Sequence, residues 1–227
     1  MKIVVKRKKL STKLYNQPQK GKFLNLLANI LILTSLLGLF FTFGPVVLQE
    51  ANYALRNIFK KTYTVKESAS ESETTVKELV PPNFDFSIVI PKIGAVAPVF
   101  ANTDPFNPAE FLPVLRQGVA HAKGTAFPGT NGNTYIFAHS TDAFYNVGRY
   151  NAVFYLLGKL EANDEVFLYY KNQKFTYRVY DKKIVNPEAV GYLGTLKKNA
   201  NTLTLQTCYP PGTTLLRLIV LAERSVQ

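Results

Sequence analysis

The sequence predicts a mainly β fold, a closed or nearly closed β-barrel with short helices, preceded by one transmembrane helix. Three observations support this prediction. Residues 23–49 form a run without a single charged side chain. After Asp85, at least seven short runs have the alternation or the β-branched and aromatic content of strands. Only two brief segments among them carry helix signals, and many short strands with little helix are typical of a barrel.

The N-terminal part of the chain predicts a membrane anchor. Residues 1–23 carry eight of the 27 Lys and Arg side chains and none of the 15 acidic ones. The uncharged run 23–49 exceeds the roughly 20 residues that span a hydrocarbon core, and the about 7 to 15 apolar residues of a cleaved signal peptide. The positive-inside rule then places the arm, residues 1–22, in the cytoplasm and the C-terminal part outside a single-pass cell membrane. Because the basic charge is largely confined to this arm, the composition does not indicate a nucleic-acid partner.

The remaining chain divides into a linker and a globular domain. Residues 50–82 are polar, rich in Ser, Glu and Thr, and closed by two prolines, which indicates a flexible stalk. Residues 83–227 form the domain. Capping and turn signals predict short helices over 107–118 and 151–160. The predicted strands lie within 86–100 (a run broken by Pro91 and Gly94), 133–140, 165–170, 174–185, 201–208 and 215–223.

Cys208 is the single cysteine of the chain, so no intrachain disulfide can form. It is the last residue of a predicted strand, directly before the turn Tyr-Pro-Pro-Gly. Strand alternation places its side chain with Thr204 and Gln206 on the more polar face. A lone cysteine is commonly a small buried apolar residue, but the polar face and the position beside a loop favour a reactive thiol.

A thiol nucleophile needs a proton acceptor, and the chain offers two histidines, His121 and His139. His139 ends a predicted strand, whereas His121 lies in a segment of weaker pattern; a structural role is the alternative for each. Arg217 interrupts an apolar strand that follows the strand of Cys208, so the two side chains can lie close together. A solvent-facing arginine on an edge strand is the alternative. Cysteine, histidine and arginine at neighbouring strand ends suit acyl transfer.

The pentapeptide TLQTC, residues 204–208, matches the Thr-Leu-x-Thr-Cys signature of sortases, the membrane-anchored cysteine transpeptidases of Gram-positive-type cell envelopes. The likeness covers about residues 83–223. The family has a segment that ends in its catalytic histidine, and residues 118–140 resemble it: GVAHAKGTAFPGTNGNTYIFAHS. The spacing of nine residues from the cysteine to the arginine is similar to that of class C, D or E sortases rather than that of class A. Ala138, where the family usually has Gly, and Gln206 depart from the common pattern.

The resemblance implies an eight-stranded β-barrel with Cys208 as nucleophile, His139 as acid/base and Arg217 as the residue that binds substrate or stabilises the oxyanion. Thr207 matches a position implicated in substrate contact, and His121 matches the first, non-catalytic histidine of many members. The implied substrate is a protein with an LPxTG-like C-terminal sorting signal, cleaved after the threonine through a thioacyl-enzyme. The implied acceptor is an amine of a cell-wall precursor or of a pilin lysine.

Two other functions remain open from the residues alone. One is a membrane-bound cysteine peptidase that only hydrolyses, and the other is a non-catalytic β-barrel adhesion module. No cofactor or metal is expected, because one Cys and two His fit no zinc spacing. Asp142, Asp164 and Glu165 offer oxygen ligands for calcium, but solvated turns are the favoured interpretation. Specificity for the sorting motif is expected in residues 186–198 and in the turn after the cysteine.

Overall fold

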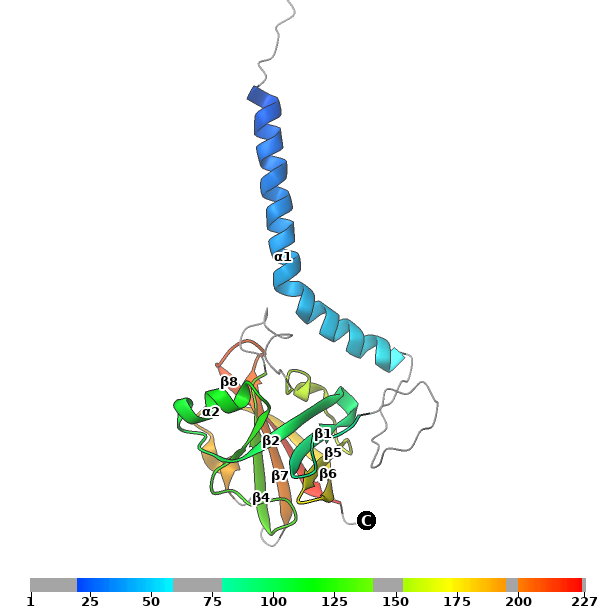
Figure 1. The fold of residues 1–227 in the computed structure, drawn as a ribbon, viewed down its shortest axis with the longest axis vertical. Coiled ribbons are helices and arrows are strands. Elements are labelled where there is room, and N and C mark those ends of the chain that lie inside the picture. Colours follow the sequence, from blue (N-terminus) through cyan, green and yellow to red (C-terminus); the bar gives the residue numbers. More distant parts are fainter. Residues whose placement is uncertain (1–19, 59–78, 141–152, 195–199, 226–227) are drawn as a thin grey trace, which may run out of the picture. The chain divides into compact units, whose positions relative to one another are not determined.

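The computed structural model describes residues 20–58, 79–140, 153–194 and 200–225 (Figure 1). The chain divides into two units, Met1–Phe41 and Thr42–Gln227. The described part of the second unit holds a closed barrel with the strand order β1-β2-β3-β4-β7-β8-β6-β5. Its strands are β1 (Phe86–Ile90), β2 (Ala95–Thr103), β3 (Val119–Ala122), β4 (Gly132–Phe137), β5 (Glu165–Tyr170), β6 (Gln173–Val185), β7 (Asn201–Tyr209) and β8 (Leu216–Arg224). The predicted mainly β fold is confirmed.

The N-terminal helix α1 (Lys20–Ile58) is 39 residues long. Its stretch Lys22–Gly44 has a mean hydropathy of 2.2, and by length and composition it is sufficient to cross a membrane. The helix continues to residue 58, so the first nine residues of the predicted flexible stalk are helical. Five of these nine residues, Glu50, Ala51, Ala54, Leu55 and Arg56, are good helix formers. Residues 59–78 of the predicted stalk lie outside the described residues.

The two predicted short helices have different outcomes. The first is α2 (Pro108–Leu115), which Asn107 caps by accepting a hydrogen bond on Oδ1 from the backbone N–H of Ala109 at 3.2 Å. The second prediction, over 151–160, is wrong for the described residues 153–160, which form turns and the single 3-10 turn η2 (Leu157–Lys159). The apolar side chains at 154, 156, 157 and 160 are buried in the core without a helix, so tertiary packing overrides their helix-like spacing, and Gly158 disfavours a helix.

Strand β3 was not predicted. Its four residues, VAHA, are too few for alternation to show, and its extended conformation comes from pairing with β2 on one side and β4 on the other. The parallel pairing of β2 with β3 also carries a register shift between Phe100 and Thr103. A strand of this kind depends on its neighbours rather than on its own sequence.

Strand alternation separates the two faces of the barrel wall. The inner face packs into the main core, for example through Ile136 of β4 and Leu205 of β7. On the outer face of β4, Tyr135 and Phe137 form a second apolar cluster with Leu115 of α2. Partly buried side chains of the 3-10 turn η3 (Val190–Leu193) pack on the same cluster. The outer face of β4 is therefore covered by α2 and by η3.

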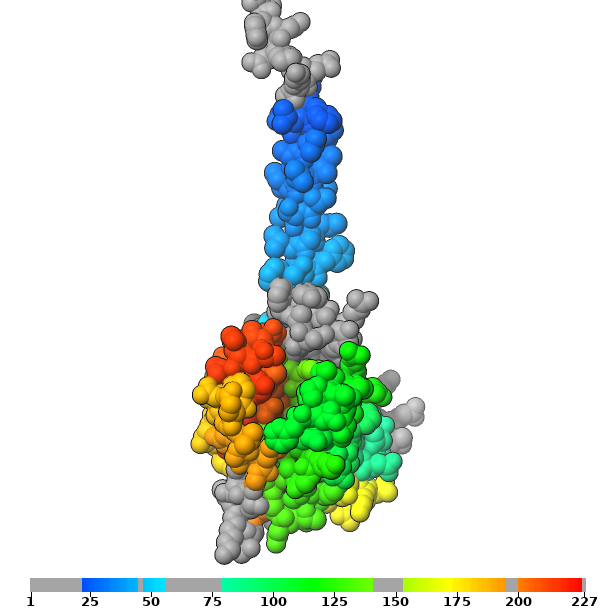
Figure 2. All heavy atoms as spheres, turned by 90° about the vertical axis from the view of Figure 1, so that its left-hand side faces the viewer, coloured from blue at the N-terminus to red at the C-terminus, as the bar shows by residue number. Residues whose placement is uncertain are grey.

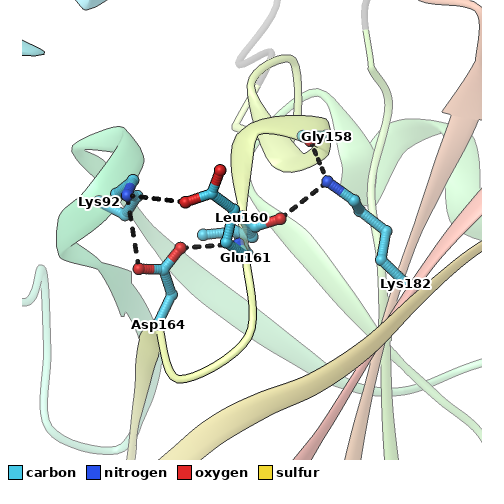
Figure 3. A network of polar contacts seen from close by, with 6 residues as sticks. All are labelled: Lys92, Gly158, Leu160, Glu161, Asp164 and Lys182. Carbon is cyan, nitrogen blue, oxygen red and sulfur yellow. Dashed lines mark hydrogen bonds and ion pairs between the residues drawn. The ribbon is translucent and has the colours of Figure 1, made fainter.

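A polar network holds the connection between η2 and β5 (Figure 3). The Nζ of Lys182 on β6 donates to two backbone carbonyls at the end of η2, at 2.6 and 2.8 Å. The Nζ of Lys92 lies 3.5 Å from Oε2 of Glu161 and 3.6 Å from Oδ1 of Asp164. Asp164 also accepts a hydrogen bond from the backbone N–H of Glu161 at 2.7 Å. These contacts fix the chain where it enters β5.

Candidate active-site cleft

A cleft of about 420 Å³ lies on the outer face of β4, β7 and β8. One wall comes from α2 and the residues before it, and the other from residues 185–193. Figure 2 shows the surface hollowed between the green atoms around α2 and the yellow-orange and red atoms on the other side. The lining is mainly apolar, and its polar side chains are Tyr135, His139, Gln206, Cys208, Thr214 and Arg217. The structure thus brings the predicted histidine, cysteine and arginine into one cleft.

Register in the β7–β8 ladder places Cys208 and Arg217 together. They are Cα partners across the antiparallel pair, so their side chains leave the same face about 5 Å apart at Cβ. The Nη1 of Arg217 donates to the carbonyls of Thr214 at 3.0 Å and Leu216 at 3.1 Å, which holds the guanidinium beside the turn. Burial raises the pKa of the half-buried Cys208 thiol, and the positive charge of Arg217 opposes part of that rise. The thiol is therefore neutral at rest at pH 7.

His139 reaches the cleft because β4 and β7 run parallel and end at the same edge of the sheet. Phe137 is the Cα partner of Gln206, and the pairing continues when Ala138 donates its N–H to the Gln206 carbonyl at 3.1 Å. The hydroxyl of Thr207 donates to the carbonyl of Ala138 at 3.0 Å. These two bonds fix the backbone directly before the histidine.

Thr207 does not line the cleft. Its side chain is 2% exposed and leaves β7 on the inner face, opposite that of its neighbour Cys208. In the structure this side chain contacts the backbone beside His139, and the substrate contact that the resemblance implied for position 207 stays a prediction.

His121 has a structural environment and does not line the cleft. Its Nδ1 accepts the backbone N–H of Asn102 at 3.3 Å, so the ring proton lies on Nε2, which donates to the Ala126 carbonyl at 3.1 Å. The ring stacks on Phe127 with the centroids 4.6 Å apart. Burial lowers the pKa of His121, so the imidazole is neutral. These contacts agree with a non-catalytic histidine.

The sequence assigned no function to two polar residues of the cleft floor, Tyr135 and Gln206. The Tyr135 hydroxyl donates to Oε1 of Gln206. Burial raises the pKa of Tyr135, and the charge of Arg217 opposes the rise, so the phenol stays neutral. Alternation placed Gln206 on the face of Cys208, but the pairing with a tyrosine from β4 depends on the register of two distant strands.

The acidic residues considered for calcium have other partners or lie outside the described part of the chain. Asp164 lies near Lys92, and Oε1 of Glu165 accepts a hydrogen bond from Nη2 of Arg178 at 3.2 Å. Asp142 belongs to the residues that the structure does not describe. Within the described ranges, no group of three His, Cys, Asp or Glu side chains is placed to hold a metal ion.

Comparisons with known proteins show which proteins this chain is similar to. Residues 88–225 match the family model for the sortase domain. Sortase D of Bacillus subtilis (strain 168) is 31% identical over 121 residues, which cover 53% of this chain and 52% of the relative, so the chain spans about half the length of this curated relative. A sortase D5 transpeptidase of Clostridium perfringens superposes with a TM-score of 0.51 at 27% identity, over 63% of this chain and 79% of that chain. Sortase C-1 of Actinomyces oris superposes with a TM-score of 0.53 at 28% identity, over 63% and 73% of the two chains.

Proposed function

The chain belongs to the sortase family, on the side of the class C and D members, and from this membership we propose that it is a membrane-anchored cysteine transpeptidase. Its substrate is a protein with an LPxTG-like C-terminal sorting signal. The observation that carries the proposal is that Cys208, His139 and Arg217 line one cleft. All three lie within the residues that match the family model.

Cys208 is the nucleophile of the proposed reaction. Because burial keeps the thiol protonated, its proton must pass to His139 before or during attack. The sulfur then attacks the carbonyl carbon of the threonine in the signal, and a C–S bond forms. The imidazolium of His139 returns the proton to the leaving amine as the C–N bond breaks, which leaves a thioacyl-enzyme. An amine of a cell-wall precursor or a pilin lysine then attacks the thioester and restores the thiol.

Arg217 stabilises the negative charge that develops on the attacked carbonyl oxygen, or holds a substrate carbonyl next to it. Two observations support this role. Its Cα is directly opposite that of the nucleophile, and its guanidinium is braced by the carbonyls of Thr214 and Leu216. A guanidinium has five N–H donors, so donors remain for a substrate after these contacts.

The walls of the cleft suit the apolar residues of a sorting signal. Phe106 and Leu112 lie on one wall, Val190 and Leu193 on the other. Phe106 and Val190 expose 69% and 52% of their surface, so they are accessible to a peptide. A volume of about 420 Å³ falls in the usual range of ligand pockets and accommodates a few residues of an extended chain.

The N-terminal helix locates the proposed reaction at the outer surface of the cell membrane. The stretch Lys22–Gly44 of α1 crosses the cell membrane, residues 1–22 lie in the cytoplasm, and the barrel acts outside. Holding the enzyme at the bilayer that also carries its substrates raises their effective concentration.

Mass spectrometry tests the proposed function. The full chain in detergent is incubated with a library of pentapeptide signals and simple amines, and ligated products are measured. We expect a product that joins the N-terminal part of a signal to the amine, and none from Cys208→Ala, whose fold is checked by circular dichroism. Normal turnover by Cys208→Ala excludes the proposal. Hydrolysis that millimolar amine does not divert into ligation supports a peptidase instead, and no reaction with any peptide favours an adhesion module.

A further inference from the structure

A buried asparagine joins two barrel strands to a wall of the cleft. Asn133 on β4 is 2% exposed. Its Oδ1 accepts hydrogen bonds from the hydroxyls of Thr202 at 3.1 Å and Thr204 at 3.0 Å, both fully buried on β7. Its Nδ2 donates to the backbone carbonyl of Tyr192 in η3 at 2.7 Å. The amide of Asn133 therefore accepts hydrogen bonds from β7 through its oxygen and donates one to η3 through its nitrogen.

Residues 186–194, here called the wall segment, gain their position from this contact and from apolar packing. Four of them, Pro187, Ala189, Val190 and Leu193, line the cleft. Tyr192 and Leu193 pack on the outer cluster of β4. The backbone hydrogen bonds inside the wall segment are local, for example from Gly194 to Gly191 at 3.3 Å, and do not attach it to the barrel.

Asn133 is remote from the reacting groups. It lies near the start of β4, six residues before His139, which follows the end of that strand; six residues of extended chain span about 20 Å. Its side chain does not line the cleft. Any effect of Asn133 on the reaction must therefore pass through the elements it holds.

We propose that Asn133 is a positioning residue that clamps the wall segment against β4, so that this side of the cleft is formed before the sorting signal binds. The identity of the substrate rests on the proposed function, but the clamp itself does not. A preformed wall spares the cost of ordering the segment during binding. Loss of the clamp therefore weakens substrate binding and leaves the chemical step at Cys208 nearly unchanged.

A matched pair of variants tests the clamp in the full chain in detergent. Asn133→Leu removes the bonds to both threonines and the bond to Tyr192, whereas the double variant Thr202→Val, Thr204→Val removes only the bonds on the barrel side. The substrate is a quenched-fluorescence Leu-Pro-Glu-Thr-Gly peptide with hydroxylamine as acceptor. For Asn133→Leu we expect KM to rise about threefold to tenfold, the loss of one hydrogen bond, with kcat within about twofold of wild type.

Hydrogen exchange followed by mass spectrometry gives a readout without turnover. Peptides that cover the wall segment should exchange about tenfold faster in Asn133→Leu than in wild type. The double threonine variant should have a lower Tm but unchanged KM and unchanged exchange in the wall segment. A KM that rises equally in both variants shows a general loss of stability and overturns the clamp, as does wild-type KM and wild-type exchange in Asn133→Leu.

Two further outcomes keep the test decisive. If Asn133→Leu does not fold, exchange in the wild-type chain decides: the clamp requires protection at the amides of Val190 and Gly194, and exchange at the rate of an unstructured peptide overturns it. If the wild-type chain does not turn over the peptide, the proposed function fails for this signal, whereas the exchange comparison still decides the clamp.

Discussion

Replacement of Arg217 by glutamine should raise the pKa of the Cys208 thiol. The two residues are directly opposed in the β7–β8 ladder. Burial already raises the pKa of Cys208, and the charge of Arg217 is the opposing influence. Glutamine keeps a polar side chain of moderate length but removes that charge, so the thiolate loses its nearest cationic stabilisation.

The size of the effect follows from the geometry. Directly opposed side chains have Cβ atoms about 5 Å apart. For a separation of about 6 Å between sulfur and guanidinium, and an effective dielectric constant of about 20 to 40, a pair of unit charges interacts by ~1.4 to 2.8 kcal/mol. This corresponds to about one to two pKa units. Below the pKa of the thiol, the thiolate fraction of Arg217→Gln is then at least about tenfold lower. Arg217→Lys keeps the charge but loses the planar set of donors, so the pKa of its Cys208 thiol should stay close to that of the wild-type chain.

Alkylation of the thiol measures this directly. Since Cys208 is the single cysteine of the chain, intact-mass analysis after iodoacetamide reports one site. We expect the midpoint of the pH profile to move up by about one to two units in Arg217→Gln and by less than about half a unit in Arg217→Lys. Transpeptidation should fall about 100-fold or more in Arg217→Gln, because oxyanion stabilisation is lost as well. An unchanged midpoint in Arg217→Gln refutes the electrostatic coupling.

Three further predictions concern stability and are checked by urea unfolding. Because burial lowers the pKa of His121 below its ordinary value of 6.5, the unfolded chain takes up a proton that the folded chain refuses as the pH falls below about 6.5. The free energy of unfolding should fall there by up to ~1.4 kcal/mol per pH unit and level off below the pKa of His121 in the folded chain. This pH dependence should be absent in His121→Gln. An identical slope in that variant contradicts the assignment of the pH dependence to His121. Lys182→Met, which removes the donor to the two carbonyls at the end of η2, should lose about 0.5 to 1 kcal/mol, whereas an unchanged midpoint shows that water replaces the contact. Tyr135→Phe, which leaves Oε1 of Gln206 without the hydroxyl, should lose about 1 kcal/mol, and a more stable variant contradicts the role of that bond.

Local patterns were sufficient for most elements of the barrel. The predicted strand over 165–170 coincides with β5, and the Asn-Pro start of α2 was visible as a capping signal. The errors occurred where local sequence is weak evidence. Strand β3 is too short to show alternation. The segment 153–160 buries its apolar side chains in turns, although their spacing resembles that of a helix.

Part of the candidate site was also visible before the fold. Alternation placed Cys208 on the polar face of its strand, and the arginine nine residues later pointed to a neighbouring strand. The roles of these residues came from the resemblance to a family and stay predictions until the variants are measured. A motif does not give the direction of each side chain: Thr207 and Cys208 are neighbours in sequence but point to opposite faces of the strand.

The sequence by itself determined the chemistry available to this protein: one thiol, two imidazoles, an arginine within an apolar strand and an apolar run long enough for a bilayer. Only the tertiary structure decided which of these groups meet. Parallel pairing of β4 with β7 brings the histidine end of one strand to the cysteine end of another, through contacts such as that between Ala138 and Thr207, 69 residues apart. The same pairing builds the clamp of Asn133 on the wall segment. Alternation and composition are properties of neighbouring residues, whereas register between distant strands follows from the closure of the whole barrel.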